Sequence, residues 1–525
     1  MIYRSRPAWG FWTRPGLAAP IIAILAVLRT TLSRGYSGSR SSDPAGGHGV
    51  GHSSRRSHGF RVGMAAAISA GALVGVGVDR ASAEEPGPIG DPVERLFETT
   101  LDNGLRVVLL EDHRTPVVAV QIWVDAGSSD ESFYTGIAHL FEHMMFKGSK
   151  NIEAEVHAQL INERGGRINA YTSRDVTVYH EDVTAESLPL VIDLEAERFL
   201  NLEISQSTLD SEREVVLEER RFRTEDTPDG RGFEALTSLV WQAHPYRWPV
   251  IGWRSDVEHV TVEACQAFFD TYYAANNLTV VIVGDFDTAP TMAQIERAFG
   301  RLPKADSIPR NPTTVVAQRG GRRANVYFEA KIPLILAGWH APASGHVDGE
   351  ALDLASQILS GGRTSRLYRT LVYDQEKALY AHGSYWEFTD AGMFYAAAGA
   401  RPGVSLDEVE TLLMAEIDRV AAEGVSEEEL ARARRQMEVA LVNRFATNHS
   451  MASRIGREIV AFGRVRPLSE RIEAIRSVTV ADVQRVVATY LKPESRSIIR
   501  VISPPLDSSE NAEPESLASR EGVAR

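Results

Sequence analysis

The second half of this chain of 525 residues repeats a pattern that is present in the first half. A shift of 213 residues places three residues of one segment on identical residues of a later one: Gly136 on Gly349, Ala138 on Ala351, and Gly148 on Gly361. Self-similarity at a long, constant shift indicates a duplicated structural unit. Because the chain is also longer than one hydrophobic core usually supports, we expect two similar domains.

Patterns typical of strands and of helices alternate along both halves. The strongest turn signal is Asp102-Asn103-Gly104, which separates two apolar runs and predicts a β-hairpin. β-Branched or alternating runs predict strands, whereas helical periodicity and capping residues predict helices. The expected strands lie within residues 96–101, 105–110, 116–124, 165–180, 278–283 and 333–340; the expected helices lie within 136–149, 152–164, 187–201, 205–223 and 349–359, with two more that begin at Ser405 and Ser426.

Shifts in composition suggest where the domains begin and end. Residues 1–83 form an Arg-rich and Ser-rich leader, and residues 301–321, rich in Pro, Arg and Gly, are typical of a linker. We therefore expect an N-terminal domain at residues 84–300 and a C-terminal domain at residues 322–503. The tail, residues 504–525, is polar and acidic, and it is expected to be disordered.

The leader has the features of an export signal. Nine Arg and a single acidic residue precede Met64, an apolar run covers residues 64–78, and Ala81-Ser82-Ala83 matches a cleavage site. The apolar run is too short to span a membrane. We expect cleavage near Ala83 and a periplasmic or secreted mature protein, by either the Sec or the twin-arginine route. A mitochondrial transit peptide is the alternative, because such peptides are also Arg-rich and poor in acidic residues.

The net charge and the cysteine content exclude few kinds of binding partner and do not identify a cellular compartment. The net charge of −14 argues against nucleic acid as a partner, because phosphate binding requires a basic surface. The single Cys265 cannot form a disulfide within the chain, so we expect a free, buried thiol.

A short segment at residues 136–149, G-I-A-H-L-F-E-H-M-M-F-K-G-S, carries the clearest chemical signal. His139 and His143 are four residues apart, so a helix places both imidazoles on one face with Glu142 beside them. The order H-x-x-E-H is that of the inverzincins, and it indicates a zinc site; the alternative is an ordinary polar helix face. In the repeat, the equivalent positions are Leu352, Ala355 and Ser356, so we expect one zinc ion per chain.

Two imidazoles leave a catalytic zinc site in need of a third protein ligand. Residues 211–221, S-E-R-E-V-V-L-E-E-R-R, place Glu212 and Glu219 seven residues apart, on one face of a helix, whereas Glu214 and Glu218 point away. Taken alone, Glu219 would be interpreted as a solvated surface residue, like most glutamates.

Together, the two motifs resemble those of the pitrilysin and insulinase family of zinc peptidases. In this chain 76 residues separate His143 from Glu219, and the motifs D-N-G-L, G-G-x-x-N-A-Y-T and S-R-L-Y are also similar. The resemblance covers nearly all of residues 96–503 and is closest to bacterial two-domain members and to the beta-type subunit of the mitochondrial processing peptidase. It implies that His139, His143 and Glu219 bind zinc, that Glu142 is the general base, and that Glu212 orients a ligand imidazole.

The resemblance also implies a fold and a reaction. The expected fold is α+β, with two homologous domains that are each a mostly antiparallel sheet with helices packed on one face, and that form half of a clamshell. Residues 84–300 would be the zinc-binding peptidase domain and residues 322–503 an inactive copy. The expected activity is zinc-dependent hydrolysis of extended, unfolded peptides. The alternative is a family subunit that is a non-catalytic scaffold or serves mitochondrial presequence processing, but a scaffold has no reason to keep all ligands.

Substrate contacts and a partner follow from the same resemblance. Asn169 and Ala170 match the family's edge strand, to which a peptide is added as a further strand, although an ordinary strand is the alternative. Many relatives hold the substrate carbonyl with an Arg and a Tyr seven residues apart. Here Tyr380 is present, but the position seven residues earlier is Tyr373. We therefore expect a dimer, either of two copies of this chain or with a paralogous partner that lacks H-x-x-E-H and supplies the Arg and Tyr pair.

Overall fold

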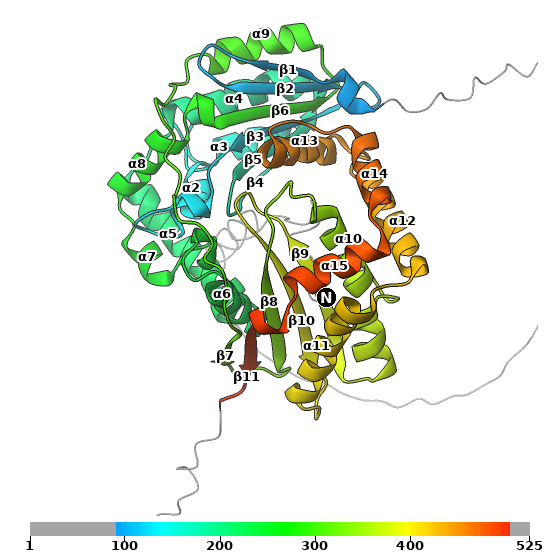
Figure 1. The fold of residues 1–525 in the computed structure, drawn as a ribbon. Helices are drawn as coiled ribbons and strands as arrows, with labels where there is room; N and C mark the ends of the chain where they lie inside the picture. Colours follow the sequence, from blue (N-terminus) through cyan, green and yellow to red (C-terminus); the bar gives the residue numbers. More distant parts are fainter. Residues whose placement is uncertain (1–90, 505–525) are drawn as a thin grey trace, which may run out of the picture. The chain divides into compact units, whose positions relative to one another are not determined.

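Two β-sheets organise residues 91–504, which are the residues that this computed structural model describes (Figure 1). The expected signal segment, residues 1–83 with its cleavage site at Ala83, lies outside the described residues, as does all of the expected tail beyond residue 504.

The first sheet contains the strands of the first half of the chain. The expected hairpin is present, and Asn103 stabilises its turn by accepting a hydrogen bond from the Leu105 amide at 3.2 Å. Neighbouring strands are antiparallel except for β2 and β6, which are parallel. The spatial order is β1 (Phe97–Thr100), β2 (Arg106–Glu111), β6 (Leu278–Gly284), β3 (Val117–Val124), β5 (Thr177–Thr184) and β4 (Arg167–Thr172).

The second sheet repeats this topology. Its order is β7 (Arg322–Tyr327), β11 (Ser497–Ile502), β8 (Leu334–Ala341), β10 (Gly392–Ala400) and β9 (Ala378–Trp386). The five strands from β2 onward and the five strands of the second sheet follow one spatial order, and each set contains one parallel pair, between its first and last strands. A helix follows the second strand of each set: α2 (Ile137–Met144) and α10 (Gly349–Ser360). The shared topology supports the duplication inferred from the sequence.

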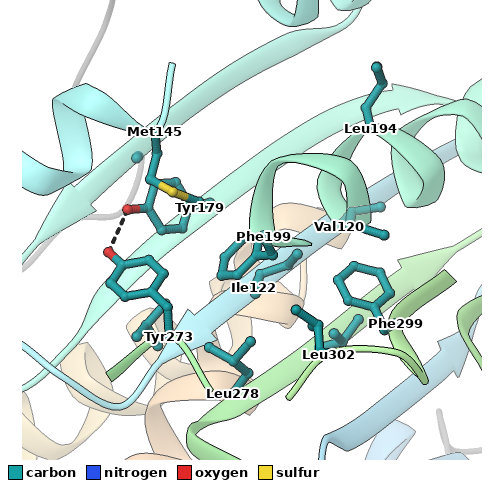
Figure 2. Close-up of a cluster of buried hydrophobic side chains, with 14 of the residues drawn as sticks. Val120, Ile122, Met145, Tyr179, Leu194, Phe199, Tyr273, Leu278, Phe299 and Leu302 are labelled. Carbon is teal, nitrogen blue, oxygen red and sulfur yellow. Dashed lines mark hydrogen bonds between the residues drawn. The ribbon is translucent and has the colours of Figure 1, made fainter. Parts of the chain in front are cut away.

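One face of each sheet is covered by helices from the same half of the chain as the strands of that sheet. In the first half, Val120 and Ile122 of β3 pack against Phe199 and Phe299 in the largest core cluster, part of which is drawn in Figure 2, and Cys265 is buried and unpaired as expected. The helices here are α2, α3 (Val156–Glu163), α4 (Leu188–Asn201), α5 (Gln206–Arg220), α7 (Arg254–His259), α8 (Val262–Tyr272) and α9 (Thr288–Phe299). Those of the second half are α10, α11 (Leu406–Glu423), α12 (Glu427–Asn443), α14 (Leu468–Ser477) and α15 (Val480–Tyr490).

The other face of each sheet is covered by a helix from the opposite half. Helix α13 (Asn448–Phe462), orange in Figure 1, packs on β3 and β6 of the first sheet. Helix α6 (Pro228–Val240) packs on β8 and β11 of the second sheet. Trp123 lies in the first of these two interfaces with Ile455, and Leu236 lies in the second with Leu336. The two halves therefore exchange one helix each.

The α+β class with two similar sheets is confirmed, and the structure adds the exchanged helices. As expected, the helices of each half pack on one face of its sheet. The strands also carry apolar residues on the other face, and the exchanged helix buries those residues. The expected helix start at Ser405 is present: Ser405 caps α11 by accepting from the Asp407 amide, and Glu408 in the first turn accepts from Lys377.

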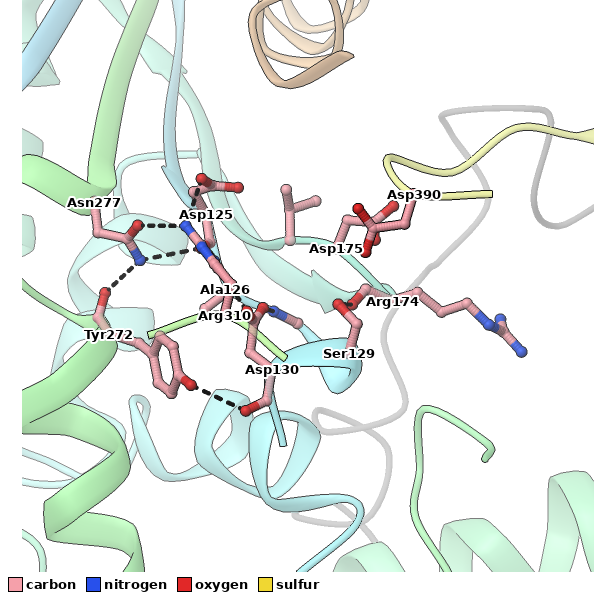
Figure 3. Close-up of polar contacts among 12 residues, drawn as sticks. Asp125, Ala126, Ser129, Asp130, Arg174, Asp175, Tyr272, Asn277, Arg310 and Asp390 are labelled. Atoms are coloured by element: carbon pink, nitrogen blue, oxygen red, sulfur yellow. Dashed lines mark hydrogen bonds and ion pairs between the residues drawn. The ribbon is translucent and has the colours of Figure 1, made fainter. Parts of the chain in front are cut away.

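The segment at residues 301–321 contains no helix or strand, but hydrogen bonds from Arg310 hold it against the first half of the chain. Figure 3 shows the Arg310 guanidinium between Asp125 and Asn277. Arg310 also donates to the buried carboxylate of Asp130 at 3.0 Å. Burial raises the pKa of Asp130 to about 6, and Arg310 opposes this rise. This segment therefore takes a defined path rather than acting as a free tether.

The exchanged helix α13 has no room for a side chain at Gly456. A Cβ atom there would lie 2.0 Å from the ring of Trp123, which is buried and donates from Nε1 to Gln121. We expect Gly456→Ala to lower the free energy of unfolding by about 1–3 kcal/mol, because overpacking forces the ring or the helix to shift. Urea unfolding followed by tryptophan fluorescence measures the change. Gly320→Ala, where a Cβ atom meets nothing within 4 Å, is the matched control, and equal effects of the two variants would contradict the close packing.

Candidate metal centre

Helix α2 presents the two histidines of the H-x-x-E-H motif on one face. The buried carboxylate of Glu131 fixes the start of the helix by accepting from the Gly136 and Ala138 amides at 2.9 and 3.0 Å. Gly136 has a φ of 86°, a left-handed conformation that favours glycine. The rings of His139 and His143 then lie 4.9 Å apart between centroids, as a four-residue helical spacing requires.

Helix α5 brings Glu219 to the same point. Glu219 Oε2 lies 3.4 Å from His143 Nε2 and 3.9 Å from His139 Nε2. Ligands of a tetrahedral ion with bonds of about 2.0–2.1 Å lie about 3.3 Å from one another. The three side chains therefore have the chemistry and the spacing to bind one zinc-like ion, and the three residues expected from the sequence are brought together here.

The Glu212 carboxylate lies on the Nδ1 side of the His143 imidazole. Glu212, 3% exposed, places Oε2 at 3.6 Å from His143 Nδ1, and its Oε1 lies 3.2 Å from Lys147 Nζ. Burial disfavours the Glu212 carboxylate, but the charges of His143 and Lys147 outweigh it and lower its pKa. Glu212 is therefore an ionised group that faces the Nδ1 side of His143, the position of a residue that orients a metal-binding imidazole.

Burial and neighbouring charges shift the pKa values of the three clustered residues in different directions. Burial lowers the pKa of His139 to about 4, so this imidazole is neutral at neutral pH. For His143 burial acts in the same direction, but the Glu212 and Glu219 carboxylates outweigh it and raise its pKa to about 9. Burial likewise opposes ionisation of Glu219, yet attraction to His143 and His139 lowers its pKa to about 2. A metal ion that binds here displaces the proton of His143.

Glu142 lies beside the cluster, and Thr172 holds one of its oxygens. The Thr172 hydroxyl, at the end of strand β4, donates to Glu142 Oε2 at 2.6 Å. Burial raises the pKa of Glu142, while the attraction of His143 and the Thr172 bond oppose the rise. A carboxylate with a raised pKa and a fixed orientation is suited to accept and return a proton.

Three neighbours of the site were not singled out from the sequence. Lys147 and Arg223 each follow a predicted site residue by four positions, so helical spacing could have indicated them. Arg223, in the π-helical segment Arg221–Glu225, contacts Glu219 Oε1 at 2.5 Å. Thr172 belongs to another element, and the sequence contains no signal for its contact with Glu142.

The strand next to the site is an edge strand, as expected for Asn169 and Ala170. Strand β4 pairs only with β5 among the described strands, and Ala170 faces Tyr179 across that pair. Helix α2 contacts β4, and Thr172 at the end of this strand donates to Glu142, so β4 lies beside the candidate metal centre. An extended peptide can add to such an edge through backbone hydrogen bonds.

The structure does not bring Tyr380 to this cluster. Tyr380 lies on β9 of the second sheet, and its hydroxyl donates to Asp229 at 3.2 Å. Tyr373, seven residues earlier, is 66% exposed. In the repeat, Leu352 and Ala355 of α10 are buried apolar residues.

Comparisons with known proteins define the class and then the family. The two-sheet fold is found in a structurally characterised protease: a protease from Helicobacter pylori superposes with a TM-score of 0.75 at 27% identity, covering 78% of this chain and 99% of that chain. The family model described as "Insulinase (Peptidase family M16)" matches residues 106–252, and "Peptidase M16 inactive domain" matches residues 259–437. The chain belongs to peptidase family M16, the insulinase family.

Curated relatives cover most of the described residues. The zinc protease PqqE of Helicobacter pylori is 28% identical over 398 residues, which are 75% of this chain and 89% of the relative. A probable mitochondrial-processing peptidase beta subunit of Arabidopsis thaliana is 26% identical over 409 residues, or 75% of this chain and 76% of the relative. Within residues 91–504, none of the helices has the length and apolar character needed to cross a membrane.

The geometry predicts that Glu219 and its neighbour Glu218 differ in their effect on metal binding. We expect Glu219→Gln to weaken binding of one zinc ion more than tenfold, because it removes the charged oxygen that faces both imidazoles. Glu218→Gln is the matched control, since Glu218 points outward and pairs with Arg221. Zinc content after equilibration against a buffered concentration of free zinc measures the difference, and equal loss in both variants would exclude Glu219 as a ligand.

Proposed function

We propose that this chain is a zinc-dependent endopeptidase that hydrolyses extended, unfolded peptides. The observation that carries the proposal is the meeting of His139, His143 and Glu219 at metal-ligand spacing with the oriented carboxylate of Glu142 beside them. Membership of a peptidase family and relatives named zinc proteases support both the reaction and the metal.

In this proposal His139, His143 and Glu219 hold one zinc ion. A zinc ion held by three protein ligands lowers the pKa of a bound water and polarises a carbonyl group. Glu142 accepts the proton of the attacking water through the oxygen that Thr172 does not hold, and then returns that proton to the leaving amine. Glu212 and Lys147 keep His143 oriented, and Arg223 keeps Glu219 oriented.

The substrate is proposed to bind as an additional strand on β4. Successive residues of a strand direct their backbone groups to opposite edges, so one of the neighbours Asn169 and Ala170 would form backbone hydrogen bonds with the peptide at the outer edge of β4, which has no partner strand within the described part of the chain. Recognition through the backbone depends little on side chains, so we expect broad specificity for peptides without stable structure.

We further propose that residues 84–300 and 322–503 are the active and inactive copies of a duplicated domain, and that the chain works as a dimer. Tyr380 contacts Asp229 rather than the metal cluster, and no Arg occupies the position of Tyr373. A paralogous partner without H-x-x-E-H would then contribute the missing Arg. The leader pattern supports export to the periplasm or beyond, with the mitochondrial matrix as the alternative.

Replacement of Glu142 tests the general base. We expect Glu142→Gln to lower kcat by about 10²–10⁴-fold, because the amide cannot accept the proton of water. Bound zinc should stay unchanged, since Glu142 is not among the three clustered ligands. Cleavage of an unfolded fluorogenic peptide gives the rate, and Glu214→Gln on an exposed part of α5 is the control. Wild-type rates in the Glu142 variant would refute its role.

Removal of the Thr172 hydroxyl should shift the pH profile in a defined direction. Glu142 is a base only when ionised, so kcat/KM falls as the pH falls through its pKa. The Thr172 hydrogen bond lowers that pKa, and Thr172→Val removes it, so the acid limb of the profile should move to higher pH. Thr172→Ser keeps a hydroxyl and should restore the wild-type limb. A shift to lower pH in Thr172→Val would contradict the assignment.

Activity of the purified chain alone tests the need for a partner. We expect slow peptide hydrolysis by this chain by itself and an increase when a paralogue that carries the missing Arg is added. Sedimentation velocity on the same samples reports whether activity follows the formation of a complex. Full activity from a monomer would rule out a required partner.

A further inference from the structure

A second group of metal-ligating side chains lies in the first half of the chain. His157 of α3, Glu181 of β5 and Glu195 of α4 each offer one ligand atom, and these atoms all lie within 4.8 Å of one another. Their exposed fractions are 8%, 0% and 2%. Three different elements thus direct an imidazole and two carboxylates to one point in the protein interior.

The contact between His157 and Glu181 is close but is not a hydrogen bond. His157 Nε2 lies 2.7 Å from Glu181 Oε1, yet neither this nitrogen nor either Glu181 oxygen has a hydrogen-bond partner among the described residues. At this distance a well-directed N–H would form a strong bond, so the nitrogen does not point at the oxygen. Two side chains whose lone pairs converge on one ion have this orientation, and because ligands of a tetrahedral ion lie about 3.3 Å apart, binding of an ion would move these two atoms apart by about 0.6 Å.

Glu195 is already oriented by an arginine. Arg198 Nε donates to Glu195 Oε2 at 2.9 Å, and a second guanidinium nitrogen contacts Oε1. The guanidinium lies over the rings of Tyr179 and Phe146, at 4.6 and 5.1 Å from the ring centres. Arg198 therefore compensates the charge of Glu195 and holds it in place. Glu181 accepts no hydrogen bond from Arg198, and the Arg198 charge only partly offsets the burial that raises the pKa of Glu181 to about 7, so this carboxylate is incompletely compensated.

The imidazole is in the form that binds metals. Burial and the nearby Arg198 lower the pKa of His157 to about 4, so the ring is neutral at neutral pH. A neutral imidazole has a lone pair available for a metal ion. A small cleft lined by His157, Arg198, Ser149 and Glu153, among others, reaches the His157 side of the cluster.

We propose that His157, Glu181 and Glu195 bind a second divalent metal ion, of the zinc class, at a site separate from the centre on α2. One imidazole and two carboxylates are donors that zinc accepts. The ion completes the charge compensation of Glu181 and joins α3, α4 and β5, so its role is structural. Because β5 pairs with the edge strand β4, the ion also stabilises the strand that carries Asn169 and Ala170.

Zinc stoichiometry of the full chain tests the second site independently of the first. The metal-stripped protein is equilibrated with zinc chloride in a buffered free-zinc solution, and bound zinc is counted by atomic emission. We expect two ions per chain in the wild type, one in Glu181→Gln, one in Glu219→Gln and none in the double variant. Glu163→Gln, exposed at the end of α3, is the matched control and should retain two.

The outcomes separate the two sites. Loss of all zinc in Glu219→Gln, or two ions in Glu181→Gln, would overturn the second site and leave His157, Glu181, Glu195 and Arg198 as a network of ion pairs only. A single ion in the wild type that is lost in Glu181→Gln but kept in Glu219→Gln would support the second site and reject the first.

A measurement on Glu219→Gln avoids any dependence on the folding of Glu181→Gln. X-ray absorption of the zinc retained by Glu219→Gln should show one imidazole with oxygen ligands, because only His157 belongs to the second site. Two imidazoles per zinc would instead identify residual binding by His139 and His143, and would overturn the proposal.

Discussion

Each sheet of this chain has two apolar faces, and the helices of its own half cover only one of them. The remaining faces are covered by exchange: α13 packs on the first sheet and α6 on the second. A face left open would expose residues such as Trp123 and Leu336 to water, so neither half buries its core without the other. The burial of both sheets therefore depends on the exchange of these two helices.

The same burial gives the ionisable groups their properties. Glu142 lies next to a packed strand, so burial raises its pKa, and His139 is held neutral for the same reason. Charged neighbours act against burial where a charge is needed: Glu219 faces the imidazolium of His143, and Glu212 faces Lys147. A metal centre on a solvated helix face would have neither the fixed carboxylates nor the shifted pKa values.

Sequence reasoning reached those parts of the fold and site that depend on local spacing. Most strands and helices, the duplication, the pair of histidines on one face of α2 and the seven-residue interval between Glu212 and Glu219 all follow from periodicity. The Thr172 contact with Glu142, the cluster of His157 with Glu181 and Glu195, and the exchange of α6 and α13 involve residues far apart in the chain. No spacing rule relates such residues, because their meeting depends on how the elements pack.

By itself, the sequence determined the helical and strand periodicities, the two similar halves and the pairing of His139 with His143 on one helix face, because these properties depend on residue type and on intervals within one element. The ligand role of Glu219 was expected only from the family resemblance. Only the tertiary structure decided that α5 approaches α2 closely enough for Glu219 to face both imidazoles, that β4 is an edge strand at this site, and that Tyr380 contacts Asp229 instead. These outcomes depend on burial of both faces of each sheet, a condition that residues distant in sequence satisfy together.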